Sequence, residues 1–180
     1  MKQLITAVCI LLPTVALAQA GAGSEFDRAE LFGGYSFLSV DGNGASRQNF
    51  NGWEASGLLN LNKWLGAEAD LSGYYKSNIA GTNVDAHDYL FTGGPRISLR
   101  PLFFHALFGA DHATASTSVA GVTASASDTA FATVLGGGVE WKIARQWAIR
   151  PSLDYVLTRH AANSQNDIRL GVGIAYAFGR

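Results

Sequence analysis

Apolar and polar residues alternate along most of this chain, in segments of about 12 residues separated by turn-forming residues. Successive side chains of a β-strand point to opposite faces, so a period of two predicts strands. Eight segments carry the pattern: 29–40, 52–62, 65–77, 87–99, 102–113, 129–142, 147–160 and 167–178. The sequence therefore predicts an all-β protein of eight antiparallel strands.

The connections between these segments alternate in length. The long ones span 41–51, 78–86, 114–128 and 161–166, and the short ones span 63–64, 100–101 and 143–146. Long loops at one end and tight turns at the other are typical of up-and-down barrels in outer membranes. The connection 114–128 consists largely of Ala, Ser, Thr, Val and Gly, and we expect it to be a mobile loop.

Two prolines conflict with regular strands. Pro95 and Pro151 fall inside predicted strands, where a residue without a backbone N–H cannot donate to its neighbour. A closed barrel has no free edge at which to place them. We therefore expect a β-bulge at each proline.

Apart from Arg159, the charged residues of the segments lie on one face when those residues are used to choose the parity of each strand. That face holds Glu30, Glu54, Glu68, Asp70, Lys76, Asp88, Arg96, Asp111, Glu140, Lys142, Arg150, Asp154 and Arg169. The aromatic residues are an independent test because they played no part in that choice. Of the 17 aromatic residues in the segments, 14 lie on the uncharged face, and Phe32, Tyr74 and Phe103 lie on the charged one.

Two kinds of barrel are compatible with these faces. In a soluble lipocalin-type barrel the apolar face lines a cavity, whereas in a transmembrane barrel it meets lipid. The uncharged face is apolar along whole strands, and the charged face mixes acids with arginines. Both features favour an eight-stranded antiparallel up-and-down transmembrane β-barrel. Four residues are expected to face lipid near mid-depth: Leu71, Ile97, Leu135 and Leu153.

Residues 1–20 have the pattern of a secretory signal peptide. Lys2 precedes an apolar stretch that is shorter than the roughly 20 residues of a membrane helix, and small residues lead up to Ala20. Cleavage after Ala18 or, as we prefer, after Ala20 leaves one barrel domain at 21–180. It also removes Cys9, the only cysteine.

Net charge and composition exclude several functions. The chain has 13 basic and 14 acidic residues, so loss of Lys2 leaves 12 against 14, with no basic block. Binding to nucleic acid is therefore not expected. The sequence contains no run of 18 uninterrupted apolar residues beyond the signal, which argues against a membrane helix.

Candidate catalytic and metal-binding residues are few. A rim set of His160, Asn163 and Ser164 is the candidate for a lipid A-modifying enzyme, but it lacks the His-x-Ser-Asn order of a lipid A deacylase. No glycine-rich loop opens a helix, and we expect no cofactor and no enzyme activity. Histidines without metal-site spacing stand at His87, His105, His112 and His160.

Several short motifs resemble a known family. They are ELFGGYS at 30–36, GPR at 94–96, DY at 154–155 and RLGVGIAYAFG at 169–179. In order and spacing they resemble the bacterial outer-membrane β-barrel domain family, which includes the OmpA transmembrane domain and small porin-like proteins. The resemblance implies an integral outer-membrane location, contact with lipid and lipopolysaccharide, and biogenesis by periplasmic chaperones and the barrel-assembly machinery. It also implies an assembly signal at Gly173, Tyr176 and Phe178, although Gly171 stands where a polar residue is usual.

The inward charges predict an ion network in the lumen. Its expected members are Glu68, Asp70, Arg96, Glu140, Arg150, Asp154 and Arg169. Glu140 with Arg150, and Asp154 with Arg169, are expected to pair across adjacent strands, about two residues from directly opposite. Because eight strands leave an interior only just wide enough for side chains, we expect a sealed barrel with a structural or surface-contact role. The alternative is a small-solute pore that opens when the ion pairs rearrange.

Overall fold

A computed structural model describes residues 27–42, 45–77, 84–119, 122–160 and 163–179. Its strands are β1 (Ala29–Gly42), β2 (Ala45–Asn60), β3 (Leu65–Lys76), β4 (Val84–Leu99), β5 (Leu102–Val119), β6 (Val122–Val139), β7 (Trp141–Lys142), β8 (Trp147–His160) and β9 (Asn163–Phe178). The predicted signal peptide, 1–20, lies outside the described residues. No helix of the described part is long and apolar enough to cross a membrane.

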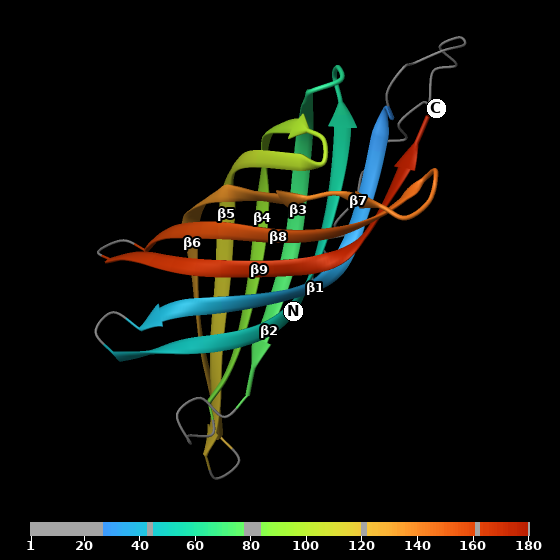
Figure 1. The fold of residues 1–180 in the computed structure, drawn as a ribbon. Helices are drawn as coiled ribbons and strands as arrows, with labels where there is room; N and C mark the ends of the chain where they lie inside the picture. Colours follow the sequence, from blue (N-terminus) through green and yellow to red (C-terminus); the bar gives the residue numbers. More distant parts are fainter. Residues whose placement is uncertain (1–26, 43–44, 78–83, 120–121, 161–162, 180) are drawn as a thin grey trace, which may run out of the picture.

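The strands form one closed antiparallel sheet (Figure 1). Neighbours in sequence pair, except that β6 pairs with β8 and not with β7, and β1 also pairs with β9. The short β7 continues β6 beyond Glu140 and pairs with β8 in the same register, so β6 and β7 are two parts of one barrel strand. The predicted eight-stranded antiparallel barrel is confirmed.

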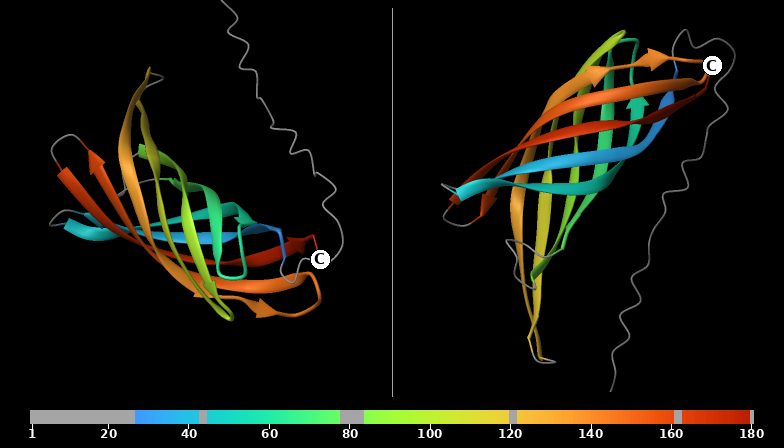
Figure 2. Two further views of the ribbon diagram at one scale, coloured as in Figure 1. Left: turned by 90° about the horizontal axis from the view of Figure 1, so that it is seen from above. Right: turned by 60° about the horizontal axis from the view of Figure 1, so that its bottom comes forward.

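The strands extend much farther than the sequence pattern predicted. β5 and β6 have 18 residues each, and their pairing continues to Val119 opposite Val122. A strand crosses a bilayer with about 9 to 11 residues, so this hairpin projects beyond the membrane. Figure 2 shows it reaching past its neighbours. The predicted loop at 114–128 is wrong for the described residues, because small and β-branched side chains without bulky charge pair as readily as they form a loop.

The other long connections are also shorter than predicted. β1 reaches Gly42 and β2 begins at Ala45, while β4 begins at Val84 and β9 at Asn163. We call this end of the barrel the long-hairpin end. The opposite end, with the connections at 61–64, 100–101 and 143–146, is the short-turn end.

The two prolines are accommodated without bulges. The β4–β5 ladder passes from Gly93–Phe108 to Arg96–His105 in unchanged register, leaving a gap that includes Pro95. Pro151 pairs with Val172 of β9 and lies beside the break between β6 and β7. The expectation of a bulge at each proline is wrong. The ladder is interrupted beside each proline, so no hydrogen bond from a backbone N–H is required there.

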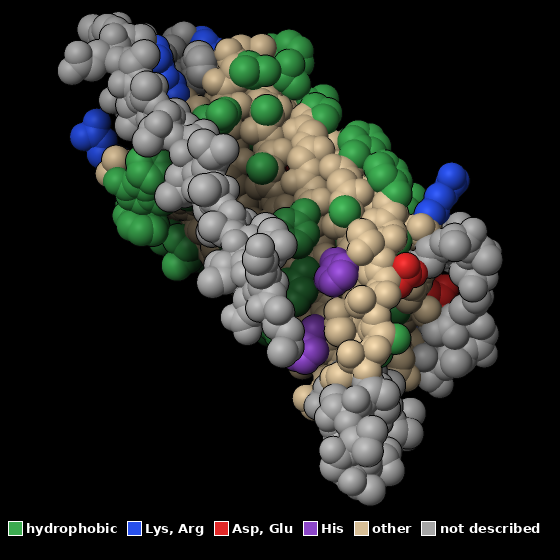
Figure 3. Space-filling view, turned by 180° about the vertical axis from the view of Figure 1, so that it is seen from behind, with side chains coloured by type: hydrophobic (Ala, Val, Ile, Leu, Met, Phe, Trp, Pro, Cys, Tyr) green, Lys and Arg blue, Asp and Glu red, His purple; other side chains and the backbone are tan. Residues whose placement is uncertain are grey.

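The charged face lies inside the barrel and the apolar face outside. Arg96 and Arg169 are 0% exposed, whereas Leu135 is 43% and Leu153 57% exposed. Phe32, Tyr74 and Phe103, the aromatic residues on the charged face, are buried in the lumen. A soluble barrel would have the opposite arrangement, so the apolar wall identifies a membrane barrel. In Figure 3 the middle of the visible wall shows hydrophobic and uncharged side chains, with charged residues and histidines toward the ends.

Aromatic residues mark both borders of the apolar wall. At the short-turn end Trp64, Trp141, Trp147 and Phe178 are exposed. Toward the long-hairpin end the Trp53 indole N–H donates to the Tyr75 hydroxyl, and that hydroxyl lies 3.3 Å from the Tyr89 hydroxyl. Amphipathic rings at these two levels are expected where hydrocarbon meets head groups.

Candidate functional site

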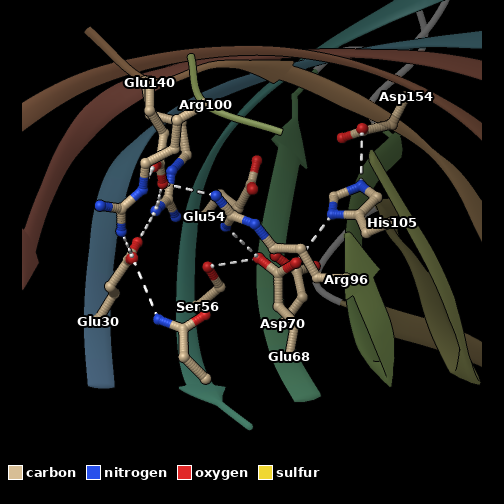
Figure 4. A network of polar contacts seen from close by, with 12 residues as sticks. Glu30, Glu54, Ser56, Glu68, Asp70, Arg96, Arg100, His105, Glu140 and Asp154 are labelled. Atoms are coloured by element: carbon tan, nitrogen blue, oxygen red, sulfur yellow. Dashed lines mark hydrogen bonds and ion pairs between the residues drawn. The ribbon is translucent and has the colours of Figure 1, made fainter. Parts of the chain in front are cut away.

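The inner face of the barrel carries a network of ion pairs that fills the lumen (Figure 4). Alternation along each strand turns every second side chain inward, so strands on opposite walls bring their charges together. Figure 4 shows Glu30, Glu68, Arg96 and Glu140 pointing toward one another from different strands.

Arg169 of β9 is the centre of one half of the network. Its Nε donates to Asp154 Oδ2 at 2.8 Å, and its Nη1 donates to Asp70 Oδ1 at 2.8 Å. Its Nη2 lies 3.9 Å from Glu54 Oε1. One guanidinium therefore contacts three carboxylates from three strands. Arg169 itself has no exposed surface.

Arg96 and Arg150 form the other half. Arg96 Nη2 lies 2.6 Å from Glu140 Oε1, and its guanidinium carbon lies 3.9 Å from the centre of the Phe103 ring. Arg150 Nη2 lies 2.6 Å from Glu30 Oε2 and also pairs with Glu140. The shared carboxylate of Glu140 joins two arginines that would otherwise repel each other.

His105 connects the two halves. Its Nδ1 lies 3.0 Å from Glu68 Oε2 and its Nε2 lies 2.9 Å from Asp154 Oδ1. Both contacts are hydrogen bonds at once only when both ring nitrogens carry a proton. Glu68 Oε1 in turn lies 3.5 Å from Arg96 Nη1. The imidazole thus links the Arg96 group, through Glu68, to the Arg169 group, through Asp154.

The network continues to the short-turn end through residues outside the predicted set. Arg100 Nη2 lies 3.0 Å from Asp27 Oδ2 and 3.3 Å from Glu30 Oε1. Lys142 Nζ lies 3.4 Å from Asp27 Oδ2, and Asp27 is buried although it precedes the first strand. The cavity at this end measures only about 10 Å³, roughly the space of one water.

All seven residues predicted for the lumen network are buried on the inner face and lie in this network. Both predicted pairs, Glu140 with Arg150 and Asp154 with Arg169, are in contact. The predicted offset of about two residues is wrong for the second pair, because Asp154 and Arg169 are directly opposite in the β8–β9 ladder. It is also wrong for the first pair, because the pairings Gly138–Ser152 and Trp141–Ile149 on either side place Glu140 opposite Arg150. The sequence reading placed Glu30 on this face without assigning it to the network.

Sequence reasoning missed His105, although its parity on the strand was a signal. It lies at inward parity on β5, two residues from buried Phe103, and it is directly opposite Arg96. From the sequence, His105 was considered only as a metal ligand. Among the described residues no group of three or more His, Cys, Asp and Glu side chains is arranged to hold a metal ion.

An apolar layer separates the network from the long-hairpin end. It consists of Leu38, Tyr74, Leu90, Leu107, Ala132, Val134 and Val156. The Tyr74 hydroxyl lies 2.9 Å from the Ser36 hydroxyl, at the border between this layer and the polar network. The lumen is therefore filled first by ion pairs and then by packed apolar side chains.

Of the remaining predicted residues, the rim set, Tyr176 and Phe178 lie toward the barrel ends, and Gly173 lies within the wall, opposite Gly34 and Arg150. His160 pairs with Asn163 in the β8–β9 ladder, but the side chains of the rim set His160, Asn163 and Ser164 lie outside the part of the chain that is described. Tyr176 packs against Trp147 and Phe178 at ring distances of 4.7 and 4.6 Å. A Cβ on Gly173 would lie 2.3 Å from the Gly33 carbonyl oxygen, so only glycine fits this approach of β9 to β1.

Comparisons with known proteins agree with this geometry. The family model of the outer membrane protein beta-barrel domain matches residues 7–179. A search of curated protein sequences found no match. Solved structures share the fold at low identity, and three of them are small bacterial surface or outer-membrane proteins.

The first is Ail, the attachment invasion locus protein of Yersinia pestis, with 19% identity and a TM-score of 0.66 over 83% of this chain and 99% of that one. Neisserial surface protein A has 10% identity and a TM-score of 0.62 over 83% and 97%. OprG of Pseudomonas aeruginosa has 11% identity and a TM-score of 0.51 over 88% and 99%.

Proposed function

The chain belongs to the outer membrane protein beta-barrel domain family and is an integral outer-membrane protein, and from that premise we propose that it is a sealed, non-enzymatic barrel whose long hairpins make surface contacts. The observation that carries this proposal is the filled lumen. Ion pairs extend from Asp27 at the short-turn end to Arg169, and the apolar layer follows directly. A barrel of eight strands has little interior left for solutes.

The hairpins at the opposite end support the surface role. Residues 122–130 of β6 pair with β5 but lie beyond the β8 ladder, which starts at Phe131. Arg47 of β2 donates to the carbonyl oxygens of Ser39 and Asn166, at 3.2 Å each, and so ties the β1–β2 hairpin to β9. Ordered hairpins that project from a rigid barrel provide a defined contact surface.

Single-channel recording in planar bilayers tests the sealed lumen. We expect no conductance steps from the folded protein, because no water-filled path crosses both the ion network and the apolar layer. The double variant Leu90→Ala/Leu107→Ala thins the apolar layer while leaving the ion pairs, and it serves as the comparison. Regular steps from the unchanged protein would overturn the sealed barrel.

A small-solute pore is the second candidate, and one observation favours it. Glu54 Oε2, Arg96 Nε and Arg150 Nε are buried without a hydrogen-bond partner among the described residues. Incomplete pairing gives the network room to rearrange. Steps that appear in the unchanged protein and disappear when Glu54 is replaced by Gln would support this alternative.

The partners proposed for this barrel follow from its location. Its apolar wall meets outer-membrane lipid, and we propose lipopolysaccharide as the lipid around the long-hairpin end. For assembly we propose periplasmic chaperones and the barrel-assembly machinery, with Gly173, Tyr176 and Phe178 of β9 as the recognised signal. We further propose that a cleaved signal peptide at 1–20 directs export, that the domain spans 21–180, and that no enzymatic step on lipid A occurs at His160.

One ligand known for a related fold is not expected here. Ail has been crystallised in complex with the heparin analogue sucrose octasulfate. A polyanion requires basic residues, whereas the cavity at the long-hairpin end of this chain has Asp88, Asp111 and Asp167 in its lining. Surface contacts of this barrel therefore differ in charge from those that hold a sulfated sugar.

A further inference from the structure

The long-hairpin end contains a cavity that the sealed lumen does not explain. It has a volume of about 350 Å³ and lies on the outer side of the apolar layer. Asp88, Asp111 and Asp167 line it, and the same three residues line a recess of about 10 Å³ beneath it. Small-molecule sites in proteins have volumes of about 300 to 1,000 Å³, so the space suits a small ligand.

The charge of this cavity is one-sided. Its carboxylates, Asp88, Asp111, Asp128 and Asp167, come from four strands, β4, β5, β6 and β9. His87 also lines the cavity, and none of the described lining residues is a lysine or an arginine. The arginines of the lumen network are separated from it by the apolar layer that includes Leu90 and Val156. Carboxylates gathered in a concave site concentrate the field and attract cations.

Two cations at this end of the barrel are held by other groups. Lys76 Nζ pairs with the Gln48 side chain and lies 5.4 Å from the centre of the Phe50 ring. Arg47 donates to backbone carbonyl oxygens on β1 and β9. Neither side chain is part of the cavity lining, in which Asp167 accepts a hydrogen bond from the backbone N–H of Asp41 at 2.8 Å.

A buried hydroxyl gives an independent sign of a ligand. Thr158 is 4% exposed, and its Oγ1 has no hydrogen-bond partner among the described residues. The side chain lines the recess together with Asp88, Asp111 and Asp167. Buried polar groups are nearly always hydrogen-bonded, so this oxygen is available to accept a bond from a ligand donor.

We propose that the cavity binds a small aliphatic cation with two or more ammonium groups. The carboxylates on separate strands match separated ammonium groups, and the lining between them includes Val40, Phe50 and Ala113, which suit methylene carbons. A bare metal ion does not fit, because the described residues contain no group of ligands arranged to hold one. The deepest ammonium donates to Thr158 Oγ1.

Calorimetric titration of the folded protein in neutral detergent micelles tests this site. The probe is 1,4-diaminobutane, and butane-1,4-diol, n-butylamine and Mg²⁺ are the comparison ligands. We expect saturable binding of the diamine, weakened by added salt, with the monoamine about tenfold weaker and no binding of the diol. Asp88→Asn and Asp167→Asn are each expected to weaken the diamine about tenfold, because each replaces a lining carboxyl group, which can ionise next to an ammonium group, with a neutral amide.

Two further variants distinguish binding in the cavity from a general attraction of cations to the charges of the barrel. Glu54→Gln removes a carboxylate from the same inner wall below the apolar layer and should leave diamine affinity unchanged. Lys76→Met removes a cation next to the cavity and should increase the affinity. Heat-modifiable mobility on gels verifies that each variant is folded. Equal binding of Mg²⁺ and diamine, equal loss in Glu54→Gln, or no binding at all would overturn the proposal.

Discussion

Arg169 has no exposed surface and holds carboxylates from β2, β3 and β8. Removing a guanidinium from water is costly, and the arrangement is stable only because Asp154 and Asp70 accept hydrogen bonds from it at 2.8 Å. The same contacts make the carboxylates dependent on the arginine. The stability of the barrel interior therefore depends on side chains that each pair with several others, such as Arg169, more than on any isolated ion pair.

Truncating this arginine should therefore destabilise the barrel. Arg169→Ala leaves Asp70 buried without its cation and leaves Asp154 with only His105 as a partner. Loss of one partner of a buried pair costs about 3 to 5 kcal/mol. The free energy of unfolding by urea in micelles measures the effect. Arg159→Ala, an exposed arginine on β8, is the control and should change it by less than about 0.5 kcal/mol. Equal midpoints for the two variants would contradict the network.

Side-chain parity explains which of these residues were predictable. A period of two fixes the face of every residue in a strand, so the inward direction of Asp70, Asp154 and Arg169 followed from the sequence. Parity gives no information outside strands, which is why Asp27 and Arg100 were missed. It also does not fix the register between strands, so the direct opposition of Asp154 and Arg169 was not foreseen.

The β5–β6 hairpin shows what the sequence left open at the scale of an element. The strands through the membrane were recognisable because apolar and charged residues alternate there. Beyond Ala113 both faces meet water, and alternation no longer distinguishes a strand from a loop. The break of one barrel strand at Glu140 was likewise invisible, because it depends on Pro151 of the neighbouring strand.

The orientation of this hairpin is testable on intact cells. The only cysteine of the chain is Cys9, in the predicted signal, so introduced cysteines would be unique in the exported protein. Ser127→Cys on the hairpin should react with a membrane-impermeant maleimide on intact cells, because long connections of outer-membrane barrels face the exterior. Ile143→Cys in a short turn should react only after permeabilisation. The reverse pattern would invert the topology.

The molecule as a whole has a polar interior and an apolar exterior. Its ion pairs lie inside because the charged side chains point inward and eight strands close the sheet around them. The exposed leucines of its outer wall are favourable only if the medium around the barrel is also apolar. The aromatic residues at Trp147 and Tyr75 then mark where that environment ends on either side.

A charge placed on the middle of the outer wall measures this environment directly. Leu135 points outward and is directly opposite Ala106 and Tyr155, within the band between the two aromatic borders. Leu135→Arg should lower the free energy of unfolding in lipid vesicles by about 2 to 4 kcal/mol, the cost of arginine at the bilayer midplane. Leu99→Arg, beside the short turn at 100–101, is the matched control and should cost about 0 to 1 kcal/mol.

An arginine would be unfavourable both in lipid and in a protein interior, so a second measurement must distinguish them. The accessibility of spin labels to oxygen and to a water-soluble reagent does so. Spin labels on cysteines introduced at Leu71, Ile97 and Leu135 should collide with oxygen dissolved in lipid and be protected from a water-soluble nickel reagent. A label at Leu99 should be reached by the nickel reagent more readily, because it lies at the end of β4. Protection of all positions from both reagents would mean that another protein surface, and not the bilayer, covers this wall.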